Sequence, residues 1–196
     1  MNPSQIPAVA AHPALEAFVR DRFDMQVSDV RTMMRLPKSA AGLSAGCNFA
    51  SVNTLCDLIA GASVLFFRPS LADLQSNAGR GQRFRDLVKQ HVPGDPLAPQ
   101  TVADILYDVV RNPLTHSLGV GGPAALLSKA PLTPTRIARL EEMGDRPSLC
   151  PPPVVLDGGS YVIDARGLYW AFYQMLYGLF SAPVHAAAAG QLVQQI

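Results

Sequence analysis

The spacing of apolar residues predicts a chain built mainly from helices. Apolar positions recur three and four residues apart over Ala14–Arg35 and again over Gly79–Val92, as expected for amphipathic helices. Asn48–Phe67 is apolar on most sides, which indicates a helix buried inside a bundle. A further helix begins near Gln100 and carries one apolar stripe. That stripe consists of Val102, Ile105, Leu106, Val109 and Val110.

The C-terminal third predicts a short helix, a hairpin and a long final helix. Thr133, followed by Pro134, is a suitable N-cap for a helix ending near Gly144. Val154–Asp157 and Ser160–Ile163 are β-like runs separated by two glycines, the pattern of a two-residue hairpin. Ala165–Ala182 is apolar almost all round, which favours burial in the bundle and in a subunit interface.

A transmembrane helix is the alternative for 165–182, because about 20 apolar residues suffice to cross a bilayer. Pro183, His185 and the lack of flanking lysine or arginine favour burial without a membrane. The predicted fold is therefore mainly α, an antiparallel helical bundle of about four to six helices. A small β-hairpin precedes the C-terminal helix, and residues 1–196 form a single domain.

Composition adds little chemistry to this picture. The net charge is +1, so no overall positive field points to a nucleic-acid partner. Three cysteines without a CxxC pair, and an N-terminus without a secretion signal, predict a protein of the reducing cytoplasm. The four histidines are scattered and match no metal-binding motif, so we expect no metal and no cofactor.

The most distinctive chemistry lies where the helix that begins near Gln100 is interrupted. Pro113 lacks an N–H and disfavours helical geometry in the residue before it, so the helix should stop or kink near Asn112. Arg111 and His116 flank this break. On a straight helix, residues five apart point roughly 140° apart. A kink, or a two-fold axis between subunits, would bring the two side chains together.

The run Arg111-Asn112-Pro113-Leu114-Thr115-His116 resembles the signature of the HEPN superfamily (higher eukaryotes and prokaryotes nucleotide-binding domains). That signature is an arginine, a polar neighbour and a histidine a few positions later. The resemblance implies a metal-independent endoribonuclease in which the ribose 2′-hydroxyl is the nucleophile. Arg111 would hold the phosphate, Asn112 would orient the phosphate or the imidazole, and His116 would be general acid or base.

The same resemblance implies partners. HEPN proteins form homodimers whose active site is shared across the interface, and RNA is the expected substrate here. An antitoxin or nucleotidyltransferase partner would accompany a role in a toxin–antitoxin or defence system.

Four further residues are candidates for substrate binding. Tyr107, one turn before Arg111, is placed to stack on a base or to support the guanidinium. Asp57 interrupts an apolar helix and needs a partner if buried, for which Arg111 or His116 is suitable; the alternative is an exposed stripe or a structural arginine. Arg80 and Arg83 lie in the most basic stretch, which is either a phosphate-binding surface or a solvated helix face.

Two other classes of function remain open. The first is a non-catalytic helical module that binds nucleotide, RNA or a protein through the same pocket. The second is a structural dimerisation protein with no ligand, in which Arg111 caps a helix C-terminus and His116 is an ordinary loop residue. Metal-free cleavage of RNA by the purified protein separates the nuclease from both.

Overall fold

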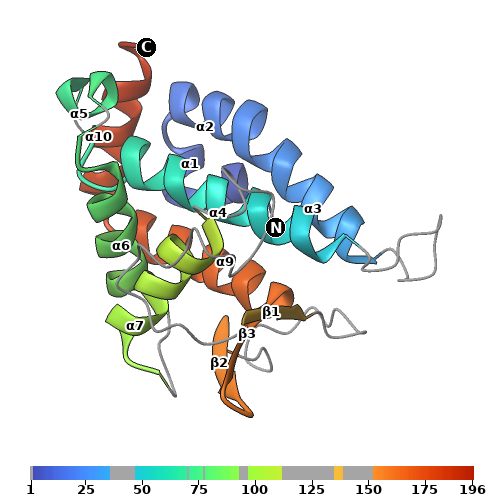
Figure 1. Ribbon diagram of the computed structural model, residues 1–196. Helices are drawn as coiled ribbons and strands as arrows, with labels where there is room; N and C mark the ends of the chain where they lie inside the picture. Colours follow the sequence, from blue (N-terminus) through green and yellow to red (C-terminus); the bar gives the residue numbers. More distant parts are fainter. Residues whose placement is uncertain are drawn as a thin grey trace.

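The computed structural model describes residues 2–35, 47–69, 71–76, 78–92, 97–111, 135–138 and 152–196, with the backbone alone for 48, 73–74, 135–138 and 160. Helices dominate these residues, and a small sheet lies at one end of the bundle (Figure 1). The N-terminal elements are η1 (Pro3–Gln5), α1 (Pro7–Ala10), α2 (Pro13–Val19), η2 (Arg20–Asp24) and α3 (Met25–Arg35). The middle elements are α4 (Asn48–Leu65), α5 (Leu71–Gln75), α6 (Arg80–His91), α7 (Pro99–Asp104) and η4 (Ile105–Arg111). The remaining elements are β1 (Thr135–Ala138), β2 (Val154–Asp157), β3 (Ser160–Asp164), α9 (Ala165–Phe180) and α10 (Pro183–Val193).

The predicted mainly helical bundle with a hairpin before the C-terminal helices is confirmed. Its central element is α4, which packs against α3, α6, α9 and η4. Leu55, Cys56, Ile59 and Ala62 of α4 have no exposed surface. A helix with neighbours on several sides has room for few polar residues, which explains why this segment is apolar on most sides.

Two of the predicted helices contain π-helical turns. The helix predicted over Ala14–Arg35 is the continuous run of α2, η2 and α3, and its middle part, η2, is π-helical. The helix that begins near Gln100 is α7 continued by η4, and η4 is also π-helical. All five residues of its predicted apolar stripe are buried. The pattern of polar and apolar residues thus indicated the buried face, although it did not indicate the change of hydrogen bonding.

The sheet confirms the predicted hairpin and corrects the helix predicted before it. β2 and β3 pair antiparallel through Gly158 and Gly159, whose φ angles are 57° and 77°. Positive φ at both turn positions is the geometry that glycine favours in tight hairpins. The short helix predicted from Thr133 to Gly144 is wrong at residues 135–138, which form β1, parallel to β3, and the rest of that range lies outside the described residues. A four-residue strand takes its hydrogen bonds from its neighbour, so pairing overrides the local helix-start signal.

The two C-terminal helices, α9 and α10, pack against the other helices of the bundle. The Asp164 carboxylate caps α9 by accepting a hydrogen bond of 2.6 Å from the Gly167 N–H. Nearly all of α9 is buried, and it packs against α4, α6, α10 and β3. α10 follows at Pro183, a good first helical residue, and lies beyond the last helix predicted from the sequence. None of the helices in the described ranges is long and apolar enough to span a membrane.

Candidate functional site

The described part of the candidate site is centred on Arg111, the last residue of η4. In a π-helix each N–H bonds to the carbonyl five residues earlier. Such turns are rare in proteins, and those that occur are often found at functional sites. Arg111 is half-buried at the end of this turn. Asn112 and His116, the other two candidate catalytic residues, lie outside the described residues.

Tyr107 lies next to Arg111, as its position one turn earlier predicts. The Arg111 guanidinium carbon is 5.9 Å from the centre of the Tyr107 ring. Arg85 of α6 approaches the same ring at 4.3 Å, and the Phe84 ring is 5.3 Å away. Both arginines lie within about 6 Å, the range of cation–π attraction. Tyr107 is therefore a support that two guanidinium groups share.

Gly81 allows this tyrosine to pack against the first turn of α6. A Cβ atom at position 81 would lie 2.6 Å from the Tyr107 hydroxyl oxygen and 2.7 Å from the ring carbon that bears it. Both distances are shorter than real Cβ contacts. The hydroxyl end of Tyr107 thus occupies the space that a side chain at position 81 would need.

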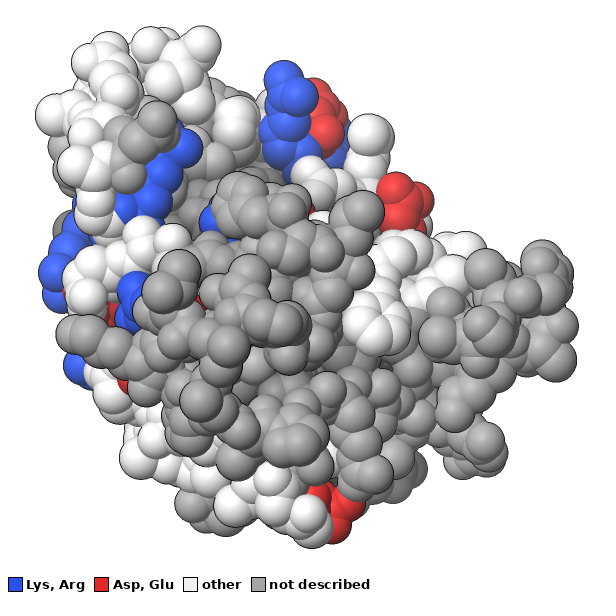
Figure 2. Space-filling model, viewed as in Figure 1, with Lys and Arg blue, Asp and Glu red and all other residues white. Residues whose placement is uncertain are grey.

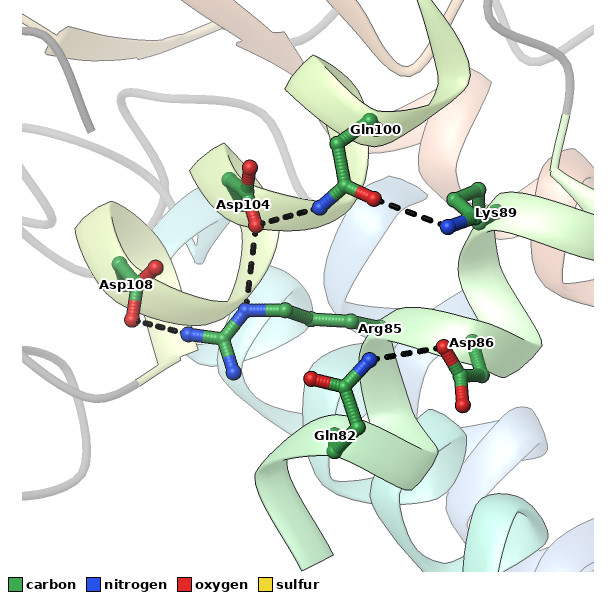
Figure 3. A network of polar contacts seen from close by, with 7 residues as sticks. All are labelled: Gln82, Arg85, Asp86, Lys89, Gln100, Asp104 and Asp108. Carbon is green, nitrogen blue, oxygen red and sulfur yellow. Dashed lines mark hydrogen bonds and ion pairs between the residues drawn. The ribbon is translucent and has the colours of Figure 1, made fainter. Parts of the chain in front are cut away.

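A polar network fixes η4 to α6 (Figure 3). Arg85 Nε lies 3.1 Å from the Asp104 carboxylate, and Arg85 Nη2 lies 2.6 Å from the Asp108 carboxylate. Gln100 donates to Asp104 at 2.9 Å and accepts from Lys89 at 3.0 Å. Arg85, Asp104 and Asp108 are partly shielded from solvent, which strengthens their ion pairs relative to fully exposed ones, whereas Lys89 and Gln100 are exposed. Arg85 thereby restrains both α7 and η4.

Arg85 is not among the site residues predicted from the sequence. A usable signal was present, because Asp104 and Asp108 lie four residues apart on the polar side of the predicted helix. Two carboxylates at that spacing share one helix face and suit one arginine from a neighbouring helix. The sequence does not show which arginine of the basic stretch lies opposite these two carboxylates.

Asp57 lies on the exposed stripe of α4, the alternative considered for it, and it is also electrostatically coupled to Arg111. Asn53 donates a hydrogen bond of 3.3 Å to its carboxylate. Partial burial raises the pKa of the Asp57 carboxyl, and the positive charge of Arg111 acts in the opposite direction. The neighbouring Cys56 thiol is fully buried, and burial raises its pKa to about 12. Cys56 therefore stays protonated and is a poor nucleophile.

The two candidate phosphate-binding arginines of α6 have different surroundings. Arg83 donates through Nε to the Ser63 carbonyl at 3.2 Å and through Nη2 to the carbonyls of Phe67 and Arg68. It thereby satisfies carbonyl groups at the C-terminal end of α4, which is a structural task. Arg80 is exposed, and its Nε donates to the Ser76 carbonyl at 3.1 Å.

In the ranges that the structure describes, no group of three or more histidine, cysteine, aspartate or glutamate side chains is placed to hold a metal ion. The chemistry that the described residues offer is that of a cation, an aromatic ring and a carboxylate brought together from α4 and η4.

No family model matches this chain, and neither the curated proteins nor the solved structures contain a match.

Proposed function

We propose that this protein is a metal-independent endoribonuclease of the HEPN type, acting on RNA in the cytoplasm as a homodimer. One observation carries the proposal: Arg111 ends η4 beside the Tyr107 ring and within the electrostatic reach of Asp57. The HEPN-like run begins at this arginine. Its guanidinium is held by an aromatic ring at one end of a rare helical turn, an arrangement that suits a group that must meet a phosphate in one orientation.

The proposed reaction needs only the substrate and these side chains. The ribose 2′-hydroxyl attacks the adjacent phosphorus, forming the P–O2′ bond while the P–O5′ bond breaks. The products are a 2′,3′-cyclic phosphate and a 5′-hydroxyl. His116 accepts the proton of the 2′-hydroxyl or donates a proton to the leaving 5′-oxygen. Arg111 donates forked hydrogen bonds to the phosphate as its negative charge grows, and Asn112 orients it.

Cleavage of a single-stranded oligoribonucleotide in excess EDTA tests the proposal. We expect His116→Ala and Arg111→Ala each to lower the rate by about 10²–10⁴-fold, the contribution typical of acid–base catalysis. Both variants should keep nearly the wild-type melting temperature. Arg22→Ala is the matched control, because Arg22 is an exposed arginine of η2, which packs mainly against η1, α2 and α3. A fully 2′-deoxy oligonucleotide should be resistant.

Equal cleavage by wild type, His116→Ala and Arg111→Ala would identify a contaminating nuclease and overturn the catalytic proposal. Loss of activity accompanied by a large drop in melting temperature would show instead that the residues are structural.

The second candidate is a non-catalytic module that binds RNA, nucleotide or a protein through the same pocket. The position of Asp57 favours the protein-binding form of this module, because a carboxylate near Arg111 competes with the phosphates of RNA or nucleotide for the guanidinium. An antitoxin or nucleotidyltransferase partner, as the HEPN resemblance implies, would fit either candidate. Tight RNA binding without cleavage products, in the same assay, would select the module.

A further inference from the structure

Arg68 has a backbone conformation that arginine rarely adopts. It follows the end of α4 with a φ of 54°, and among the described residues it alone combines positive φ with a side chain. This left-handed conformation is unfavourable for residues with a Cβ, and glycine adopts it most readily. A non-glycine residue held there motivates a functional hypothesis for its side chain.

The Arg68 side chain is exposed and held in one place. Its guanidinium carbon lies 4.8 Å from the centre of the Phe67 ring, and Phe67 itself is 3% exposed. A ring that is fixed in the core provides a rigid base for the cation. In the part of the chain that the structure describes, no carboxylate forms an ion pair with Arg68. The guanidinium is thus presented to solvent at a fixed place, with its charge not neutralised by those residues.

Arg68 is joined to the candidate site through the beginning of α6. The Arg68 carbonyl accepts a hydrogen bond of 2.9 Å from Arg83, which lies one turn after Arg80. The next residue, Gly81, touches Tyr107, and Tyr107 supports Arg111. Basic side chains also gather on the left of Figure 2, the side on which Figure 1 places α5 and α6. A series of contacts through the beginning of α6 and Tyr107 therefore leads from Arg68 to Arg111, and Arg80 lies along it.

We infer that Arg68 and Arg80 form a phosphate-binding strip that extends the Arg111 site along the first turn of α6 and holds the backbone of single-stranded RNA. The inference rests on the proposed function, because it takes Arg111 as the place where the scissile phosphate binds. The strip would contact phosphates on one side of that position and carry no sequence preference, since contacts to backbone phosphates contain no sequence information.

The test is RNA affinity in a His116→Ala background, which keeps the RNA intact. A fluorescent oligouridylate of ten nucleotides is titrated at several salt concentrations. Arg68→Gly removes the cation while allowing the left-handed backbone, and Arg80→Gln removes the second cation. We expect each change to weaken binding at low salt by about fivefold, the factor for one exposed charge pair at 4 Å in water. The double variant should flatten the dependence of log affinity on log salt by about 1.4, or 0.7 per phosphate contact.

Two controls make the result specific. Arg22→Gln removes a positive charge from η2, outside the strip, and should leave affinity and salt dependence unchanged. Arg68→Lys keeps the charge and should retain most of the affinity. The melting temperature of Arg68→Gly should stay the same or rise, because glycine relieves the left-handed backbone.

Unchanged affinity and unchanged salt dependence in the double variant would overturn the strip. So would an equal loss in Arg22→Gln, which would show that only total charge matters. Absence of any RNA binding by the His116→Ala protein would overturn it as well. Failure of the proposed function is scored separately, by the cleavage assay with an intact His116: RNA binding that depends on Arg68 without cleavage supports the strip and rejects the nuclease.

Discussion

At Gly81, helix propensity and packing favour different residues. Alanine is more favourable than glycine inside a helix by about 1 kcal/mol. The space for an alanine methyl is taken by Tyr107, whose hydroxyl oxygen lies 2.6 Å from the position of a Cβ. Tyr107 has little freedom to move away, because Arg85 lies 4.3 Å from the centre of its ring and Phe84 packs beside it. A glycine in an otherwise helical pattern is therefore explained by one side chain of another helix.

We predict that Gly81→Ala destabilises the protein by about 1–3 kcal/mol, as overpacking of a tight contact does. Gly61→Ala is the matched control, because a Cβ there would be 3.7 Å from Phe23, an ordinary contact, and the substitution should stabilise α4. In a Tyr107→Ala background the penalty at position 81 should disappear. Urea unfolding of the four proteins of this cycle measures the effect. A Gly81→Ala protein more stable than wild type would contradict the packing argument.

At the scale of elements, the sequence predicted what depends on local pattern and missed what depends on distant partners. The prediction that the apolar stripe from Val102 to Val110 is buried is confirmed, because side-chain burial along a helix repeats with the period of the helix itself. The prediction of the hairpin around Gly158 is confirmed, because the residues that determine its turn lie next to each other in the sequence. β1 was missed because its hydrogen-bond partners, around Val162, lie more than 20 residues away in the sequence. The contribution of Arg85 to the site was missed for the same reason.

The C-terminal end of α6 contains a histidine whose surroundings disfavour its charge. His91 packs edge-on against Phe67, with ring centres 6.4 Å apart, and lies against Gly178 of α9. Its Nε2 atom is buried and makes no hydrogen bond to the described residues. Burial lowers the pKa of His91, and the nearby His185 of α10 lowers it further. Three helices, α6, α9 and α10, therefore meet around a neutral imidazole.

We predict that this contact weakens the fold in mild acid. The unfolded chain binds a proton at His91 near pH 6.5, an ordinary histidine value, whereas the folded chain binds it only at lower pH. Stability from the neutral imidazole is therefore complete above about pH 6.5 and is lost as the pH falls towards the lower folded-state pKa. The free energy of unfolding, measured between pH 8 and 5, should fall less steeply for His91→Gln than for wild type. Parallel curves for the two proteins would contradict the prediction.

At the scale of the whole molecule, α9 lies buried in the bundle, as its composition predicted. Its apolar residues on every side also predict a subunit interface. Most of α9 is buried within its own chain, with Tyr169 and Phe172 among the largest fully buried side chains. The helix is apolar because neighbours surround it, so its composition does not require a second subunit. The case for a dimer therefore depends on the Arg111–His116 motif and the HEPN resemblance.

The dimer is the final prediction, and subunit mixing tests it together with the shared site. Light scattering after size exclusion at micromolar concentration should give twice the chain mass of 20.9 kDa. Arg111→Ala and His116→Ala proteins, each inactive alone, are then unfolded together and refolded at equal amounts. Half of the resulting dimers are mixed, and a site that takes Arg111 from one chain and His116 from the other is intact once in each mixed dimer. Activity should therefore recover to about a quarter of wild type. If each site instead lies within one chain, every site in the mixture carries a substitution and no activity returns. A monomer mass would remove the shared site altogether.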